Sequence, residues 1–316
     1  MSIIPRGFTN RLRAAFAPRT RTCDSAECKP DTTVWRKHLR PRPRVQLHGP
    51  QFCLQDCLER ELRRRLQQLS VAPIAEGASS RRVPLGLMML SRGELTAEQL
   101  RHAVDLQNQA GSGRIGEWLR KLGYTDDEGL TAALARQWCC PTIKSLPTSV
   151  GNCTIPFYLL QRFRMAPVHF SNSRETLYIA FAEKIAYRAL LAIEQILQCK
   201  TEICITSCGE IDAALSRLDE HTRRADKLFE NITSEQEVTR IISSYAATLQ
   251  ASEIRLGLCG KLVWSRITGN KFSEDLIFSP AATNAPYIER SRATPKFSVY
   301  DGALNGSTNS SAPARK

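Results

Sequence analysis

The sequence predicts an α+β protein. A helical subdomain built from a tandem repeat comes first, followed by a small α/β subdomain, with a disordered basic N-terminal arm and a disordered C-terminal tail. The first supporting observation is a 24-residue phrase that occurs twice without a gap, at 84–107 and 114–137. The second is a change, from about residue 155, to short apolar runs typical of alternating helices and strands. The third is the abundance of Arg and Pro at 1–49 and of Ser, Asn, Ala and Pro in the tail.

The two copies of the phrase match at many positions, and six residues separate them. Such a match indicates a tandem repeat rather than chance. Paired positions with identical residues include Gly86 and Gly116, Gly93 and Gly123, Leu100 and Leu130, Ala103 and Ala133, and Gln107 and Gln137.

Each copy is expected to form two short helices around a glycine. The first helices, 85–92 and 115–122, should stop at Gly93 and Gly123, because glycine suits the residue after a helix. The second helices should begin with capping boxes, in which a hydroxyl side chain bonds to the third helical residue. The residues predicted for these boxes are Thr96 with Gln99, and Thr125 with Glu128.

The phrase resembles the Arg-Leu-Gly…Gly…Leu…Leu…Gln repeat of the MshEN domain. That domain is the N-terminal module of type II secretion and type IV pilus assembly ATPases of the GspE kind. In the family, paired copies bind the bacterial second messenger cyclic di-GMP, so the resemblance implies this ligand here. The ligand-facing residues that the resemblance implies are Leu85, Gly86, Leu100, Val104 and Gln107 from copy one, and Arg114, Ile115, Gly116, Glu117, Leu130, Leu134 and Gln137 from copy two.

The chemistry of these residues suits a two-fold symmetric dinucleotide. Glycine at a helix start permits close approach of a base or phosphate, arginine can read the O6/N7 edge of guanine, and leucines offer an apolar floor. Copy one departs from the family, because Pro84 stands where an arginine is usual. Arg81 or Arg82 is a possible substitute. The alternative is that the repeat only packs a helical bundle and that the site is vestigial.

The chain after the repeat is expected to alternate helices and strands. Helices are predicted at 156–163, 186–197 and 210–218, and strands at 166–170, 176–182 and 201–206. This order resembles the second half of the same family domain, so the resemblance covers about residues 84–220.

The segment after a charged linker at 219–233 resembles the opening of the next domain of the secretion ATPases. A helix is expected at 237–249 and hairpin strands at 251–256 and 261–266. The family motif Ala-Ser-Asp-Ile-His appears here as Ala-Ser-Glu-Ile-Arg, from Ala251 to Arg255. The sequence has no Gly-x4-Gly-Lys-Ser/Thr phosphate loop, so we expect no ATP hydrolysis. No His/Ser/Asp triad or paired-carboxylate signature stands out either, so we expect a protein that is not an enzyme.

Two pairs of cysteines lie near the N-terminus, Cys23 with Cys28, and Cys53 with Cys57 at the start of a helix predicted at 54–69. Four thiolates satisfy tetrahedral zinc, and a helix N-terminus favours the thiolate form. The arrangement resembles a small treble-clef zinc finger, although neither spacing is the tight Cys-x2-Cys of well-marked fingers. Four ordinary cysteines in a poorly ordered arm are the alternative, and His38 and His48 are substitute ligands of lower weight.

These observations predict a division of the chain into five parts. They are a mostly disordered basic arm at 1–49, a helix with the candidate zinc knuckle at 50–79, an MshEN-like domain at 80–222 (repeat 84–140, α/β half 141–222), a truncated ATPase-like segment at 223–277, and a disordered tail at 278–316.

Charge and cysteine content narrow the class of protein. Residues 1–82 hold seventeen Lys and Arg against seven Asp and Glu, so the arm can attract nucleic acid, acidic membrane or acidic protein, or serve only as a solvated tail. Eleven cysteines without an export signal favour reduced thiols, and we expect a cytoplasmic protein. The main hypothesis is a non-enzymatic cyclic di-GMP receptor or adaptor. The rivals are a nucleotide-free docking module for secretion or pilus proteins and a zinc-containing nucleic-acid-binding regulator.

Overall fold

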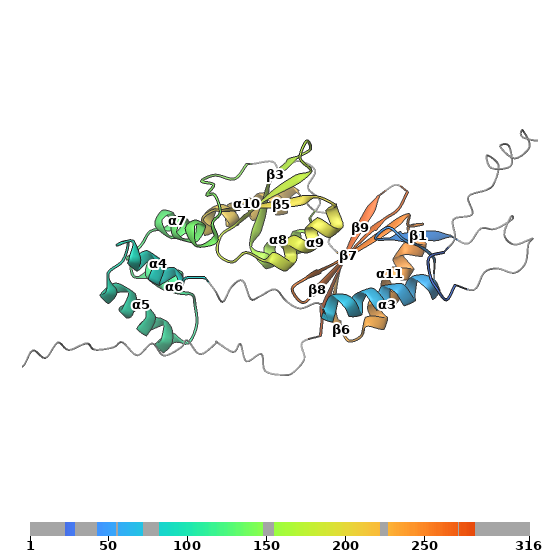
Figure 1. The fold of residues 1–316 in the computed structure, drawn as a ribbon, viewed down its shortest axis with the longest axis horizontal. Helices are drawn as coiled ribbons and strands as arrows, with labels where there is room; N and C mark the ends of the chain where they lie inside the picture. The colour runs from blue at the N-terminus through green and yellow to red at the C-terminus, as the bar shows by residue number, and fades with distance from the viewer. Residues whose placement is uncertain are drawn as a thin grey trace, which may run out of the picture. The chain divides into compact units, whose positions relative to one another are not determined.

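The computed structural model describes residues 23–28, 43–54, 56–71, 82–147, 155–221, 227–270 and 272–281. These residues form a helical repeat subdomain, a three-stranded sheet with helices, and a six-stranded sheet with helices (Figure 1). The α+β class predicted from the sequence is therefore confirmed. Within the described residues, none of the helices has the length and apolar character that crossing a bilayer requires.

The repeat subdomain contains two pairs of helices, as predicted. Helices α4 (Leu85–Ser91) and α5 (Ala97–Ala110) belong to copy one, and α6 (Ile115–Lys121) and α7 (Asp127–Trp138) to copy two. Gly93 and Gly123 follow α4 and α6 with φ of 71° and 69°, a region open to glycine at little cost. Both glycines thus end their helices where the sequence places the stop.

The second helix of each copy starts with a side-chain cap, but only one cap is the predicted one. Thr96 accepts a hydrogen bond from the Gln99 backbone, and the Gln99 side chain completes the capping box. In copy two the cap is Asp126, whose carboxylate accepts from the Gly129 N–H at 2.7 Å, and not Thr125. Aspartate is at least as good an N-cap as threonine, and Asp126 is also the residue that aligns with Thr96.

The helices of the two copies share one core, so the copies do not form two separate helical hairpins. Helix α4 of copy one contacts α7 of copy two, and α6 of copy two contacts α5 of copy one. Their shared core contains Leu85, Met89 and Leu95 from copy one and Leu119 and Ala133 from copy two. Neither copy buries its apolar face alone, which explains in physical terms why the phrase occurs twice.

The α/β subdomain is built on a sheet in the order β3-β4-β5. Strands β3 (Met165–Ser171) and β4 (Thr176–Phe181) are antiparallel, while β4 and β5 (Lys200–Ile205) are parallel. Helix α9 (Tyr187–Leu197) makes the crossover between the parallel strands, and α8 (Phe157–Phe163) and α10 (Cys208–His221) complete the unit. Each element lies within a few residues of its prediction, because strong apolar periodicity marks all of them.

The six-stranded sheet joins parts of the chain that are far apart in sequence. Its order is β2-β1-β7-β8-β9-β6, and β1 pairs in parallel with β7 across some two hundred residues of sequence. We call this unit the split domain, because residues 43–71 and 227–281 build it together. The N-terminal elements are β1 (Arg44–Leu47), β2 (Gln51–Cys53) and α3 (Asp56–Val71), and the C-terminal ones are β6 (Lys227–Ile232), α11 (Glu235–Thr248), β7 (Glu253–Cys259), β8 (Leu262–Thr268) and β9 (Ser273–Pro280).

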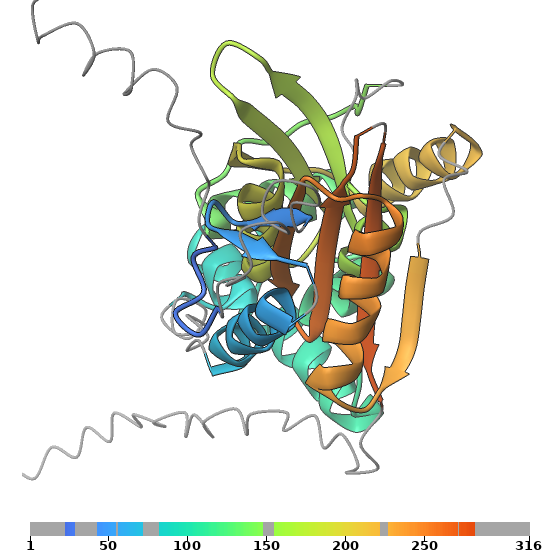
Figure 2. The ribbon, with the colours of Figure 1, turned by 90° about the vertical axis from the view of Figure 1, so that its right-hand side faces the viewer.

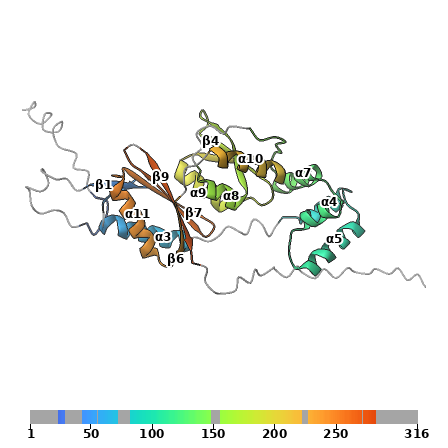
Figure 3. The ribbon, with the colours of Figure 1, turned by 180° about the vertical axis from the view of Figure 1, so that it is seen from behind.

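Helices α3 and α11 pack together and cover one face of this sheet (Figures 2 and 3). The core beneath them includes Leu58 and Leu62 of α3, Ile242 of α11, and Ile254 and Leu276 of the strands. The other face receives α9 of the α/β subdomain, which packs on β7 and β8. The split domain therefore contacts the α/β subdomain through a buried sheet face.

Three sequence predictions are corrected by the split domain. Residues 44–47 of the predicted arm are strand β1, since Val45 and Leu47 are buried. The predicted linker 219–233 contains the end of α10 and the strand β6, whose Phe229 stacks on Phe278. The predicted disordered tail begins too early, because Phe278 is only 2% exposed in β9. Residues 1–22, 29–42 and 282–316, and with them the other disorder predictions and His38, lie outside the described residues.

Candidate functional site

A pocket lies where the repeat subdomain meets the α/β subdomain. Copy one contributes only Leu85 to its lining, and copy two contributes most of it. The α/β subdomain contributes residues after β4 and at the start of α10. The lining consists of Leu85, Arg114, Gly116, Glu117, Arg120, Asp127, Leu130, Thr131, Leu134, Ala182, Glu183 and Cys208.

The polar side of the pocket centres on the carboxylate of Glu183. The Arg114 guanidinium donates to Glu183 Oε2, and the Cys208 thiol lies 3.5 Å from Glu183 Oε1. Burial, and then the neighbouring carboxylate, raises the pKa of the Cys208 thiol, so this thiol is a protonated donor at neutral pH. A second ion pair, Arg120 Nη1 to Asp127 Oδ1 at 2.9 Å, lies at the same pocket.

The apolar side is formed by leucines that the two repeat glycines allow to come close. A Cβ added at Gly116 would lie 2.9 Å from Leu130 Cδ1 and 3.5 Å from Leu85 Cδ2. At the matching position of copy one, a Cβ on Gly86 would lie 2.5 Å from Leu100 Cδ1. A methyl group at either position would force the facing leucine to move, and of the two glycines only Gly116 borders the pocket.

The terminal glutamines of the two copies make equivalent bonds that cross between the copies. Gln107 Nε2 donates to the Gly113 carbonyl at 2.8 Å, just before the first helix of copy two. Gln137 Nε2 donates to the Val83 carbonyl at 2.8 Å, just before the first helix of copy one. These bonds relate the two copies by approximate two-fold symmetry.

The symmetry is broken at the residue preceding each first helix. Arg114 has extended backbone angles and a side chain that reaches Glu183, whereas its counterpart Pro84 has no side-chain donor. Arg82 does not replace the missing arginine at the pocket, because its guanidinium stacks 3.5 Å above the Trp138 ring and donates to the Tyr187 hydroxyl at 3.0 Å. Arg81 lies outside the described residues.

Half of the predicted ligand-facing residues line this pocket: Leu85, Arg114, Gly116, Glu117, Leu130 and Leu134. The other six are not part of its lining. They are Gly86, Leu100, Val104, Gln107, Ile115 and Gln137.

The contribution of the α/β subdomain to the pocket was not predicted from the sequence. Glu183 follows β4 and Cys208 follows β5, so both stand beyond the carboxyl ends of two parallel strands. Ligands of α/β proteins commonly bind at this edge of a parallel sheet. The predicted strands were therefore the signal that could have identified Glu183.

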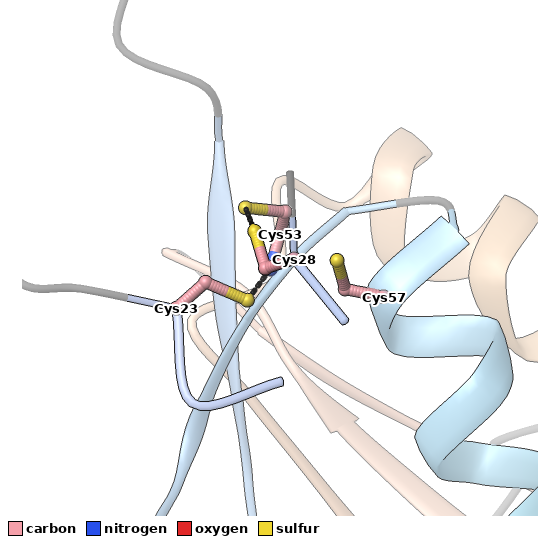
Figure 4. A group of neighbouring side chains, drawn as sticks. All are labelled: Cys23, Cys28, Cys53 and Cys57. Atoms are coloured by element: carbon pink, nitrogen blue, oxygen red, sulfur yellow. Dashed lines mark hydrogen bonds between the residues drawn. The ribbon is translucent and has the colours of Figure 1, made fainter. Parts of the chain in front are cut away.

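A second cluster of candidate ligands is the predicted set of four cysteines, Cys23, Cys28, Cys53 and Cys57. The structure brings their sulfurs together, all within 4.8 Å of one another (Figure 4). Burial acts to raise the pKa of Cys23, but hydrogen bonds from the Ser25 and Cys53 backbone and from the Cys28 and Cys53 thiols together lower that pKa. Burial and bonds to the other thiols raise the pKa of Cys28 to about 12. His48 is not a member, because its Nε2 accepts a hydrogen bond from the Leu256 N–H at 2.8 Å.

Comparison with known proteins finds solved structures of similar modules. A structure of MshE with cdg (cyclic di-GMP) is 24% identical and covers 43% of this chain and 99% of its own, with a TM-score of 0.36. The N-terminal domain of XpsE is 17% identical over 43% of this chain and 97% of its own, with a TM-score of 0.35. Neither a protein-family model nor a curated protein matches the chain.

The matched modules are of the class that the tandem phrase resembles. At TM-scores below 0.5 the likeness supports no inference about a ligand or a partner.

Proposed function

We propose that this protein is a non-enzymatic receptor for cyclic di-GMP, with its binding site in the pocket between the repeat and α/β subdomains. The observation that carries the proposal is the lining of that pocket. Leucines from both copies meet there with two ion pairs, of which Arg114 with Glu183 joins the two subdomains. An apolar floor with a donor and an acceptor at its edge suits a planar base that has both kinds of group.

Guanine fits the polar pair better than adenine. Arg114 can donate to guanine O6 and N7, and the Glu183 carboxylate can accept from guanine N1–H and N2–H. Adenine has no N1–H donor, so it makes fewer hydrogen bonds to the Glu183 carboxylate. Leu85, Leu130 and Leu134 cover the base with apolar surface, which favours burial of a flat aromatic ring.

The two-fold relation between the copies suits a ligand that is itself two-fold symmetric. Cyclic di-GMP has two guanines, and the crossed glutamine bonds relate two equivalent halves of the protein. The half-site of copy two has Arg114, while that of copy one has Pro84. One missing guanine contact costs about 1–3 kcal/mol, so we expect binding weaker than that of a repeat with two arginines.

The proposed role is that of a receptor or adaptor, and these 316 residues contain no Gly-x4-Gly-Lys-Ser/Thr phosphate loop that would indicate ATP hydrolysis. The resemblance of the tandem phrase to MshEN domains implies partners in secretion or pilus machinery. A nucleotide-free docking module remains the alternative, and binding of cyclic di-GMP separates the two.

Replacing Glu183 with glutamine is expected to weaken binding of cyclic di-GMP by about ten-fold or more. Hydrogen bonds to a charged group contribute about 1.5–3 kcal/mol, and glutamine turns one acceptor into a donor. Binding of cyclic di-AMP should change little, so the preference for guanine falls. The measurement is titration of both dinucleotides into the wild type and the variant.

Glu128→Gln is the matched control for this test, because Glu128 is an exposed carboxylate paired with Lys144 and does not line the pocket. It should bind cyclic di-GMP like the wild type. Unchanged affinity of Glu183→Gln, or an equal loss in Glu128→Gln, would count against the assigned role of Glu183.

A further inference from the structure

The four-cysteine cluster is assembled from three separate pieces of the N-terminal part of the chain. Cys23 and Cys28 flank a turn, Cys53 ends β2, and Cys57 lies in the first turn of α3. Cys53 and Cys57 are buried, and Cys23 and Cys28 are half-buried. Figure 4 shows the four side chains converging from the turn, the hairpin and the helix.

The turn that bears Cys23 and Cys28 is fixed to the hairpin by backbone hydrogen bonds. The Asp24 N–H donates to the Gln51 carbonyl at 2.8 Å, and the Gln51 N–H donates to Asp24 Oδ2 at 2.6 Å. The Cys53 N–H points at Cys23 Sγ, 3.4 Å away. N–H donors directed at sulfur stabilise the thiolate form and orient a metal ligand.

We propose that Cys23, Cys28, Cys53 and Cys57 bind one Zn²⁺ ion. Zn–S bonds of about 2.3 Å place the sulfurs of a tetrahedral site about 3.8 Å apart. Cys28 Sγ and Cys53 Sγ are 3.9 Å apart, and all four sulfurs lie within 4.8 Å of one another. One ion can therefore bind all four after small side-chain rotations, whereas a multi-iron cluster would need sulfurs farther apart.

Positive groups next to the cluster offset the charge of four thiolates. Arg60 donates to Cys57 Sγ at 3.8 Å and is held in place by an ion pair with Glu27. Cys57 also lies in the first turn of the 16-residue helix α3, where the helix dipole favours negative charge. Soft thiolate ligands in tetrahedral geometry are the set that zinc prefers.

The order of parts resembles that of a treble-clef finger: a turn with two ligands, a hairpin that ends at Cys53, and a helix whose first turn contains Cys57. Here the hairpin does not stand alone, because β1 pairs with β7 and α3 packs on α11. The ion would therefore hold the turn, the hairpin and α3 to one another, and this unit packs on the strands and helix from 227–281. Loss of the ion should loosen β1, β2 and α3 together.

Metal analysis of the full chain, purified under reducing conditions, tests the proposal. We expect about one zinc per chain and its loss from Cys23→Ser and Cys28→Ser, which alter half-buried residues. Cys139→Ser, at an exposed cysteine after α7, is the matched control and should keep the ion. Replacement of the ion by Co²⁺ in the wild type should give the absorption bands of tetrahedral cobalt thiolate, a readout that needs no variant.

Three results would overturn the proposal. One is protein without metal whose four thiols are free to react. Another is a pair of disulfides among these cysteines, visible by mass spectrometry without reductant. The third is iron in place of zinc in protein from metal-replete cells.

Discussion

Replacing Arg114 with alanine is expected to abolish measurable binding of cyclic di-GMP and to leave the unfolding midpoint nearly unchanged. Its side chain is 54% exposed and forms one ion pair, with Glu183, and such exposed pairs contribute little to stability. A bidentate contact with guanine is worth about 1–3 kcal/mol. The variant would also leave the Glu183 carboxylate uncompensated beside a ligand with two negative phosphates, which adds to the loss.

Two substitutions show whether charge or geometry is responsible. Arg114→Lys keeps the charge without the bidentate fork, so it should recover only part of the affinity. Pro84→Arg should tighten binding, because residue 84 already has an extended ψ of 139°, close to the 153° of Arg114. Equal affinity of wild type and Arg114→Ala would show that Arg114 does not read the base.

Replacing Trp264 with alanine is expected to lower the free energy of unfolding by about 3–5 kcal/mol, as for other large buried aromatic residues. Trp264 is fully buried on the sheet face that receives α9, in one cluster with Ala192, Ile193 and Ile196. Its Nε1 also donates to Asp275 Oδ1 at 2.8 Å. The substitution therefore leaves a cavity and an acceptor that has lost one donor.

The regions that lose stability in Trp264→Ala are as informative as the size of the loss in unfolding free energy. Because the cluster combines residues of the α/β subdomain and the split domain, hydrogen exchange should rise in both 187–197 and 253–280. Trp264→Phe retains most of the packing and should lose much less stability. Faster exchange in 253–280 alone would contradict packing of α9 on the sheet.

Features of the fold set by neighbouring residues could be predicted from the sequence. Gly93 and Gly123 end their helices as expected, and Thr96 with Gln99 forms the expected capping box. The cap predicted at Thr125 is wrong, because the structure has Asp126 at this position. In the alignment of the two copies Asp126 stands opposite Thr96, so the alignment predicts the observed cap.

Features that depend on distant parts of the chain could not be predicted in this way. Strand β1 is only four residues long. It pairs with β7, and nothing in the sequence of either strand indicates that the two are neighbours. Strand β6 contains the charged residues Lys227 and Glu230 and has no fully buried position, so its sequence has the pattern of a linker. Glu183 joins Arg114 from a different subdomain, and no spacing between the two residues indicates the contact.

The four cysteines are an intermediate case. Their residue type suggested a site, while their spacing was too loose to establish one. The structure supplies the missing information, because the turn, the hairpin and the start of α3 bring the four sulfurs within 4.8 Å of one another.

Calorimetric titration of the full chain with cyclic di-GMP tests the central proposal most directly. The two copies form one two-fold arrangement with one described pocket, so we predict saturation at about one ligand per chain. Arg114→Ala should lose this binding, and Pro84→Arg should strengthen it. Absence of saturable binding up to roughly 1 mM ligand, which corresponds to about −4 kcal/mol, would contradict the proposal and leave the repeat as a packing unit.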